Sequence, residues 1–214
     1  PLSTSFDAAG PMGHSAECCA IMDDIMAGGS GRAETPFPVA GLRLAIPRGY
    51  LFDDLDPAVA AGFDAAVARL SAAGAMISDI SLDILEELRP ANRPNSIVSA
   101  EAHELHRAML AARRDGYDPH IASRLDGGGE IAAADYIAMH RERTETSNAV
   151  QAITRPFDAM LVPTSPTIRR ISEMAEEPVL YNSQFGTYTN FTNLADLCAL
   201  ALPAGMREDG LPAG

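Results

Sequence analysis

Lysine is absent from this sequence. All 16 residues of the lysine and arginine class are arginine, so the 214 residues hold no lysine general base, Schiff-base amine or P-loop lysine. Positive charge is also scarce, because 29 acidic residues leave a formal net charge of −13. We therefore expect no direct nucleic-acid partner, since phosphate binding rests on basic patches.

Cysteines are few and long apolar runs are missing. Cys18, Cys19 and Cys198 form no pairable framework, which favours a reducing compartment and hence a cytoplasmic protein. No stretch reaches the roughly 18 apolar residues of a membrane-spanning helix, so we expect no membrane partner.

The residues that are present suffice for a sizeable core. Of the 214 residues, 47% are hydrophobic and only 21% are charged, which is typical of a folded domain. The chain begins at Pro1 without a methionine and closes on a Gly- and Pro-containing turn at 210–214. Both ends are typical of interior sequence, so we expect a fragment of a longer protein.

A strand–helix–strand unit is predicted in the first half of the chain. Residues 42–46 have the pattern of a short strand, which we expect to stop at Pro47. Asp56 precedes a proline and can cap a helix that Gly74 ends. Residues 76–80 follow as a second strand, which suits a parallel sheet.

Other elements are predicted by apolar periodicity and by glycine and proline boundaries. They are a helix at 15–27, long helices at 96–113 and 130–154 joined by a glycine loop at 127–129, a buried strand at 159–162, a short helix at 189–196 and a strand at 199–202. Alternation of strands with helices predicts an α/β fold.

Two motifs suggest catalytic chemistry only loosely. His103 and His106 are three residues apart, whereas a zincin helix places its histidines four apart, and no third ligand is evident. We therefore interpret both as surface histidines and expect no metal and no cofactor. Ser15, in Gly13–Glu17, resembles a nucleophile elbow without its second glycine or preceding strand, and a helix-capping role fits it better.

Glu101 is predicted to be partly buried, because it shares a helix face with Ile97 and Leu105. A buried carboxylate needs a partner, and an ion pair with an arginine is the structural interpretation. A functional role is the alternative.

Residues 181–193 carry neutral polar and aromatic side chains and no charge. Three asparagines, three threonines, two tyrosines and two phenylalanines stand within these thirteen residues. Such a mixture can bind a small polar substrate, or it can form the start of a buried polar helix.

Three blocks of the chain resemble the amidase signature family, in the family's order. They are Pro1–Met12, which resembles the stretch just after that family's catalytic core, Asp158–Pro166, which resembles its strand and Pro-Thr loop, and residues 193–205 with 210–214, which resemble its closing segment.

The resemblance implies an α/β/α sandwich around a large, mixed and mostly parallel sheet. It also implies hydrolysis of an amide C–N bond by a Ser–cis-Ser–Lys triad, with lysine as base through a bridging serine and a second serine as nucleophile. In the family these three residues precede the position of Pro1, so residues 1–214 are expected to be the C-terminal portion of a single domain, without catalytic residues and inactive alone. The substrate-binding candidates are Thr164, Ser165, Tyr188, Asn190 and Asn193.

The particular amidase is left open. Residues 187–197 are similar to the tail of allophanate hydrolases, but the segment that holds substrate in those enzymes aligns with 94–102, where Pro94 and Ala102 replace its tyrosine and arginine. The alternatives are an amidase acting on another small amide, an allophanate hydrolase, the A subunit of a tRNA-dependent amidotransferase, and a non-catalytic binding or assembly module. The expected partner is a small-molecule amide, and a homodimer is left open.

Overall fold

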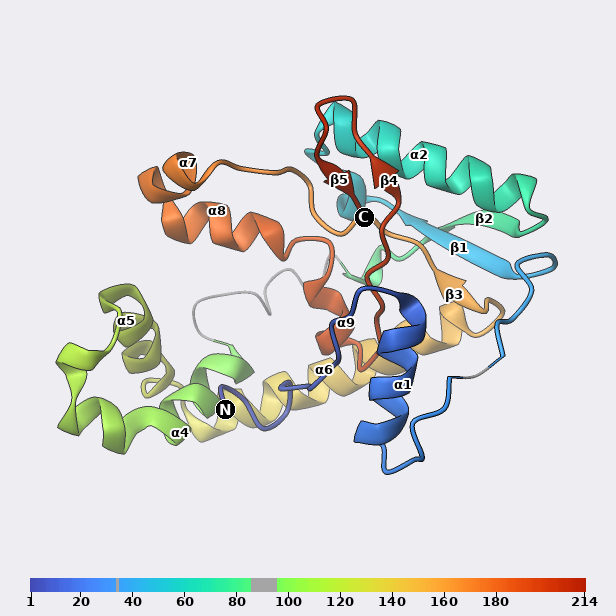
Figure 1. Cartoon of the computed structure of the whole chain (residues 1–214). Helices are drawn as coiled ribbons and strands as arrows, with labels where there is room; N and C mark the ends of the chain where they lie inside the picture. The colour runs from blue at the N-terminus through green and yellow to red at the C-terminus, as the bar shows by residue number, and fades with distance from the viewer. Residues whose placement is uncertain (34, 86–95) are drawn as a thin grey trace.

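A parallel sheet is built from strands β1 (Arg43–Arg48), β2 (Met76–Ser81) and β3 (Ala159–Met160). In the computed structural model, which describes residues 1–33, 35–85 and 96–214, the strand order is β2-β1-β3 (Figure 1). The four inner residues of β1 are buried, as expected for a strand covered on both faces. The α/β class predicted from the alternation of elements is confirmed.

Helix α2 (Pro57–Ala72) connects β1 to β2 and confirms the predicted strand–helix–strand unit. The Asp56 carboxylate accepts a hydrogen bond of 2.8 Å from Ala58 N, and a proline occupies the first helical turn. Gly74 follows the helix with φ +95°, a conformation that glycine adopts without strain.

The predicted end of the first strand at Pro47 is wrong, because β1 continues to Arg48. Arg43 and Ala45 accept hydrogen bonds from the amides of Asp158 and Leu161, on the side of β3. Pro47 lies two residues after Ala45, so its backbone nitrogen also faces β3. This position lies beyond the last described hydrogen bond between β1 and β3. A proline is tolerated there because the ladder requires no donor.

Helices α4 (Ile97–Ala112) and α6 (Ala133–Thr154) confirm the two long helices, although α6 begins three residues later than predicted. The glycine loop predicted to join them is wrong. A short turn, η3 (Arg114–Gly116), and helix α5 (Pro119–Gly128) lie between them. Asp118 caps α5 ahead of its proline, and two of the three glycines form the last turn of that helix.

The C-terminal region holds three short helices and a hairpin. They are α7 (Ile171–Glu176), α8 (Pro178–Phe185), α9 (Asn190–Leu194), β4 (Gly205–Met206) and β5 (Pro212–Ala213). Helix α9 confirms the helix predicted at 189–196, whereas α7 and α8 were not predicted. The strand predicted at 199–202 is wrong, and these described residues run as coil. The strand at 159–162 is shorter and less buried than predicted.

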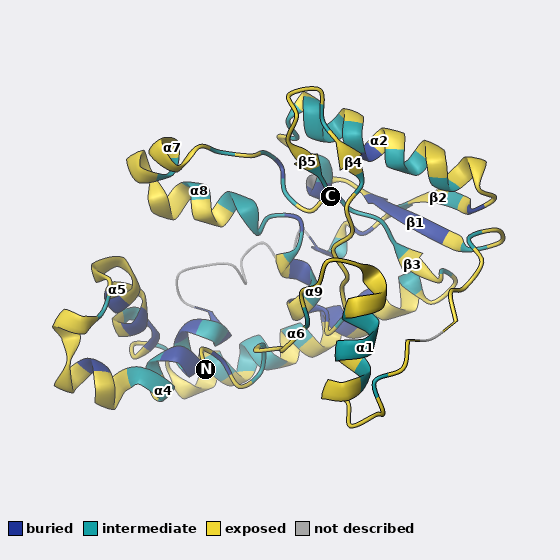
Figure 2. Cartoon of the chain, in the orientation of Figure 1, coloured by how far each residue is buried: buried dark blue, intermediate teal, exposed yellow. Residues whose placement is uncertain are grey.

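A buried cluster joins the sheet region to α6 and α9. Its members come from the turn η1 (Tyr50–Phe52), from the segment after β2, from α6 and from the region of α9; they are Leu51, Leu82, Leu85, Val150, Tyr188, Phe191, Leu194 and Ala195. A second cluster packs α4 against α5. Figure 2 shows both as dark segments, with the outer helices largely exposed.

Helix α1 (Ala16–Met26) confirms the first predicted helix, with the Ser15 hydroxyl accepting from Cys18 N at 3.1 Å. None of its eleven residues, all of them described, is buried. In the described part of the chain, no helix is both long and apolar enough to cross a bilayer.

Candidate functional site

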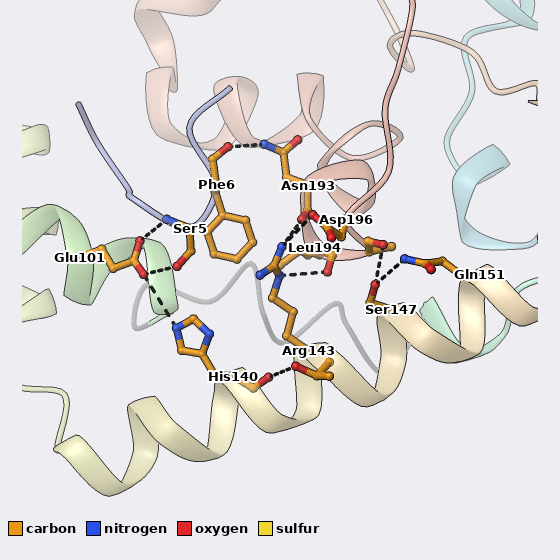
Figure 3. A network of polar contacts seen from close by, with 12 residues as sticks. Ser5, Phe6, Glu101, His140, Arg143, Ser147, Gln151, Asn193, Leu194 and Asp196 are labelled. Atoms are coloured by element: carbon orange, nitrogen blue, oxygen red, sulfur yellow. Dashed lines mark hydrogen bonds and ion pairs between the residues drawn. The ribbon is translucent and has the colours of Figure 1, made fainter. Parts of the chain in front are cut away.

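Glu101 lies on the buried face of α4, where the N-terminal segment and α6 meet it (Figure 3). Its side chain is only 7% exposed. One carboxylate oxygen, Oε2, accepts from the Ser3 hydroxyl and, at 3.0 Å, from the Ser5 amide. The other, Oε1, accepts from the Ser5 hydroxyl at 2.5 Å and from the Tyr136 hydroxyl at 2.8 Å. Each of the two carboxylate oxygens therefore accepts hydrogen bonds from two donors.

These donors keep the carboxylate ionised. Burial alone raises the pKa of Glu101, but the hydrogen bonds from Ser3, Ser5 and Tyr136 outweigh it and lower the pKa to about 2. The predicted burial of Glu101 is confirmed. The predicted arginine partner is wrong, because among the described residues the carboxylate is bound by hydroxyl and amide groups.

His140 approaches the same carboxylate from the next turn of α6. Its ring packs edge-on against Tyr136 with centroids 4.5 Å apart, and its Nε2 is 3.8 Å from Glu101 Oε1. That nitrogen is buried without a hydrogen-bond partner among the described residues.

The N-terminal segment, residues 1–7, is also held from α9. Asn193 Nδ2 donates a 3.0 Å hydrogen bond to the Phe6 carbonyl, and the Arg143 guanidinium lies 4.4 Å from the centre of the Phe6 ring. Arg143 in turn donates to the Leu194 and Asn193 carbonyls at 3.2 and 3.1 Å. Asn193, a predicted binding residue, therefore contacts the N-terminal segment.

Thr164 and Ser165 lie on the loop after β3, and its neighbours hold that loop from two sides. Asp56 N donates to the Pro166 carbonyl at 2.9 Å, and Thr164 N donates to the Gly214 carbonyl at 3.3 Å. Thr164 is exposed, whereas the half-buried Ser165 donates its hydroxyl to the Thr167 carbonyl at 2.9 Å. The loop is therefore fixed between the start of α2 and the C-terminal hairpin.

Tyr188 and Asn190 differ in their surroundings although they are two residues apart. Tyr188 is fully buried in the core, and its hydroxyl donates to the Asp53 carbonyl. Burial, with the nearby Asp54 and Asp53 charges, raises the pKa of Tyr188 to about 12. Asn190 is exposed at the start of α9, with its side-chain amide against Gly186.

The five predicted binding residues fall in two places. Tyr188, Asn190 and Asn193 belong to α9 and the turn before it, and Thr164 and Ser165 belong to the loop after β3. No hydrogen bond joins the two groups within the described part of the chain. Their role in binding a substrate stays a prediction.

Sequence reasoning missed Ser3, Ser5, Tyr136 and His140 as partners of Glu101. The available signal was the requirement that a buried carboxylate be satisfied, but nothing local identifies donors so distant in sequence. Within the segment compared above with the substrate-holding stretch of allophanate hydrolases, Pro94 lies outside the described residues. Ala102 is buried in α4.

His103 and His106, the two histidines spaced three residues apart, are half-buried and have structural partners. His103 Nδ1 lies 2.8 Å from the Leu125 carbonyl, and His106 lies 2.9 Å from both the Tyr117 hydroxyl and the Pro1 carbonyl. Among the residues the structure describes, no group of three or more potential ligands could hold a metal ion.

Comparison with known proteins identifies the family. The sequence profile of the amidase family matches residues 1–214. An amidase of Pseudomonas putida is 30% identical over 229 residues, which cover 98% of this chain and 49% of that protein. The urea amidolyase of Saccharomyces cerevisiae is 37% identical over 154 residues, covering 71% of this chain and 8% of that protein.

A solved structure of Kluyveromyces lactis allophanate hydrolase superposes with a TM-score of 0.73 and 34% identity. The superposition covers 83% of this chain and 29% of that one. The fold is thus the α/β fold of the amidase signature proteins, and the chain belongs to the amidase family. It spans half or less of the length of each of these relatives.

Proposed function

We propose that residues 1–214 are the C-terminal portion of an amidase domain whose complete form hydrolyses the C–N bond of a small amide. The observation that carries this proposal is the match of the amidase family over the whole chain. The lack of lysine agrees with it, because a lysine base then has to come from outside these residues.

In this proposal the residues before Pro1 supply the lysine, the bridging serine and the nucleophilic serine. The lysine takes the proton of the nucleophile through the bridging serine, an acyl-enzyme forms as the amine leaves, and water hydrolyses the acyl-enzyme. This chain supplies the surroundings of that chemistry. The exposed Asn190 and Thr164 offer neutral donors and acceptors to an amide, while the buried Tyr188 supports the turn before α9.

Allophanate hydrolysis is the second candidate, supported by the similarity to urea amidolyase and allophanate hydrolase. Ala102 weakens it, because a buried alanine in α4 stands where the resemblance expects a substrate-binding arginine. An amidotransferase A subunit and a non-catalytic module are the remaining alternatives. A reducing compartment such as the cytoplasm belongs to the same proposal and is supported by three free cysteines.

The first test is the coding sequence upstream of Pro1, which should encode one lysine and two serines in the family pattern. If they are missing, the non-catalytic module replaces the amidase. The second test measures ammonia release by the complete protein from a panel of small amides that includes allophanate. Residues 1–214 alone should release none.

Asn190→Ala tests the binding site without disturbing the core, because Asn190 is exposed. We expect reduced kcat/KM in the complete protein with an unchanged unfolding curve. Tyr188→Ala does not separate an effect on substrate binding from an effect on stability, since it empties part of the core.

Size-exclusion chromatography with light scattering on the same samples distinguishes a homodimer from a monomer.

A further inference from the structure

Glu101 is the point at which three separate parts of the chain are joined. The carboxylate belongs to α4, two of its donor residues belong to the N-terminal segment, and the third belongs to α6. Ser3 is itself buried, so its hydroxyl has exchanged water for this carboxylate. A buried carboxylate that needs its full set of donors can enforce one register between the segments that supply them.

The hydrogen bonds at Glu101 specify position as well as proximity. Oε2 accepts from Ser3 Oγ and from the Ser5 amide, and Oε1 accepts from Ser5 Oγ. A slip of the N-terminal segment by one residue would turn these serines away and leave a buried carboxylate short of donors. The segment can therefore occupy one register on α4.

The same segment is fixed against α9 at its other end. Asn193 donates to the Phe6 carbonyl, one residue beyond Ser5, and Arg143 covers the Phe6 ring. Residues 3–6 thus connect α4 to the helix that carries two of the predicted binding residues, Asn190 and Asn193. Displacing this segment would alter the relation between α9 and whatever polypeptide precedes Pro1.

We propose that Glu101 is a positioning residue of the amidase, which fixes residues 1–7 and through them aligns the polypeptide before Pro1 with α9. This inference rests on the proposed function, because that polypeptide is where the triad is expected. Glu101 does not touch the substrate in this account. Its effect on turnover passes through Ser3 and Ser5.

The test compares Glu101→Ala with Glu104→Ala in the complete protein. Glu104 lies on the same helix, is 68% exposed and forms only a 3.7 Å ion pair with Arg107, so it is a matched control. We expect Glu101→Ala to lower kcat by about 10- to 100-fold with KM within about twofold, after normalisation by active-site titration. The control should keep the wild-type kcat.

Two milder variants keep the test decisive if Glu101→Ala does not fold. Glu101→Gln retains one carbonyl acceptor and should recover part of the lost kcat. Tyr136→Phe removes one donor and keeps the ring beside His140, so it should give a smaller loss. In each variant, amide hydrogen exchange should rise selectively in residues 1–7.

The outcomes separate the inference from the proposed function. Unchanged exchange in residues 1–7 of the Glu101 variants, or increased exchange with unchanged kcat, overturns the positioning role. The positioning role is also overturned if amide hydrogen exchange rises throughout the molecule and the active-site titre falls while kcat per active site stays at the wild-type value. A wild-type protein that hydrolyses no amide overturns the proposed function, while the exchange comparison still decides whether Glu101 holds the segment.

Discussion

Replacing Glu101 by glutamine is expected to remove a part of the folding stability that depends on pH. The pKa of this carboxyl falls from an ordinary 4.5 to about 2 in the folded chain. At about 1.4 kcal/mol for each pKa unit, ionisation of Glu101 stabilises the folded state by about 3–4 kcal/mol. Little of this is screened by solvent, because the side chain is 7% exposed.

The lowered pKa of Glu101 determines how its contribution to folding stability depends on pH. A carboxyl whose folded pKa is lowered contributes its full stability above the unfolded pKa of about 4.5. The contribution is lost as the pH falls from about 4.5 to about 2. Glutamine does not titrate, so the difference in unfolding free energy between wild type and Glu101→Gln should shrink over this interval.

Urea unfolding of both proteins at several pH values between 7 and 2.5 measures this difference. The unfolding free energy of the variant has to be subtracted from that of the wild type because other carboxyl groups also titrate. Asp126 and Asp158 have lowered pKa values, held down by hydrogen bonds from Arg114 and Arg43. These exposed pairs titrate equally in both proteins and cancel. A difference that stays constant within about 0.5 kcal/mol across the range would refute the hydrogen-bonding account of Glu101.

Four further variants test the core, an exposed control site and one helix cap. Leu51→Ala, at a site 1% exposed, should cost about 2–5 kcal/mol in urea unfolding, whereas Leu200→Ala, at a site 68% exposed, should change it by less than about 0.5 kcal/mol; equal effects would contradict the described core. Tyr188→Phe should cost about 1–2 kcal/mol because the hydrogen bond from the buried hydroxyl to the Asp53 carbonyl is lost, and alkaline absorbance titration should lose a tyrosine that ionises near pH 12. Ser15→Ala should destabilise α1 by about 1 kcal/mol, seen as faster amide exchange in that helix, while the unfolding midpoint stays unchanged because α1 has no buried residue.

Local chemistry explains why several element boundaries were predictable. Asp56 and Ser15 cap their helices through groups only two or three residues away, and Gly74 ends α2 by its own backbone conformation. Such signals depend on neighbours in the sequence, so no tertiary information is needed to interpret them. Asp118 caps α5 in the same way as Asp56 caps α2, although α5 was not predicted from the sequence.

Packing decided the elements that were predicted incorrectly. Pro47 stays in a strand because its missing N–H faces the side where β3 no longer pairs, which the sequence cannot show. Residues 199–202 form a short apolar run, but in the described structure they have no ladder partner and run as coil. Strand formation requires a neighbour, and that neighbour is set by the fold.

The sequence by itself determined that this chain is an acidic α/β protein without lysine, that Glu101 is buried, and that its blocks resemble an amidase. Only the tertiary structure decided what satisfies Glu101. Its donors stand 98 and 96 residues away at Ser3 and Ser5, and 35 away at Tyr136. Burial follows from helix periodicity within a few residues. The identity of a partner depends on which distant segments the completed fold brings together.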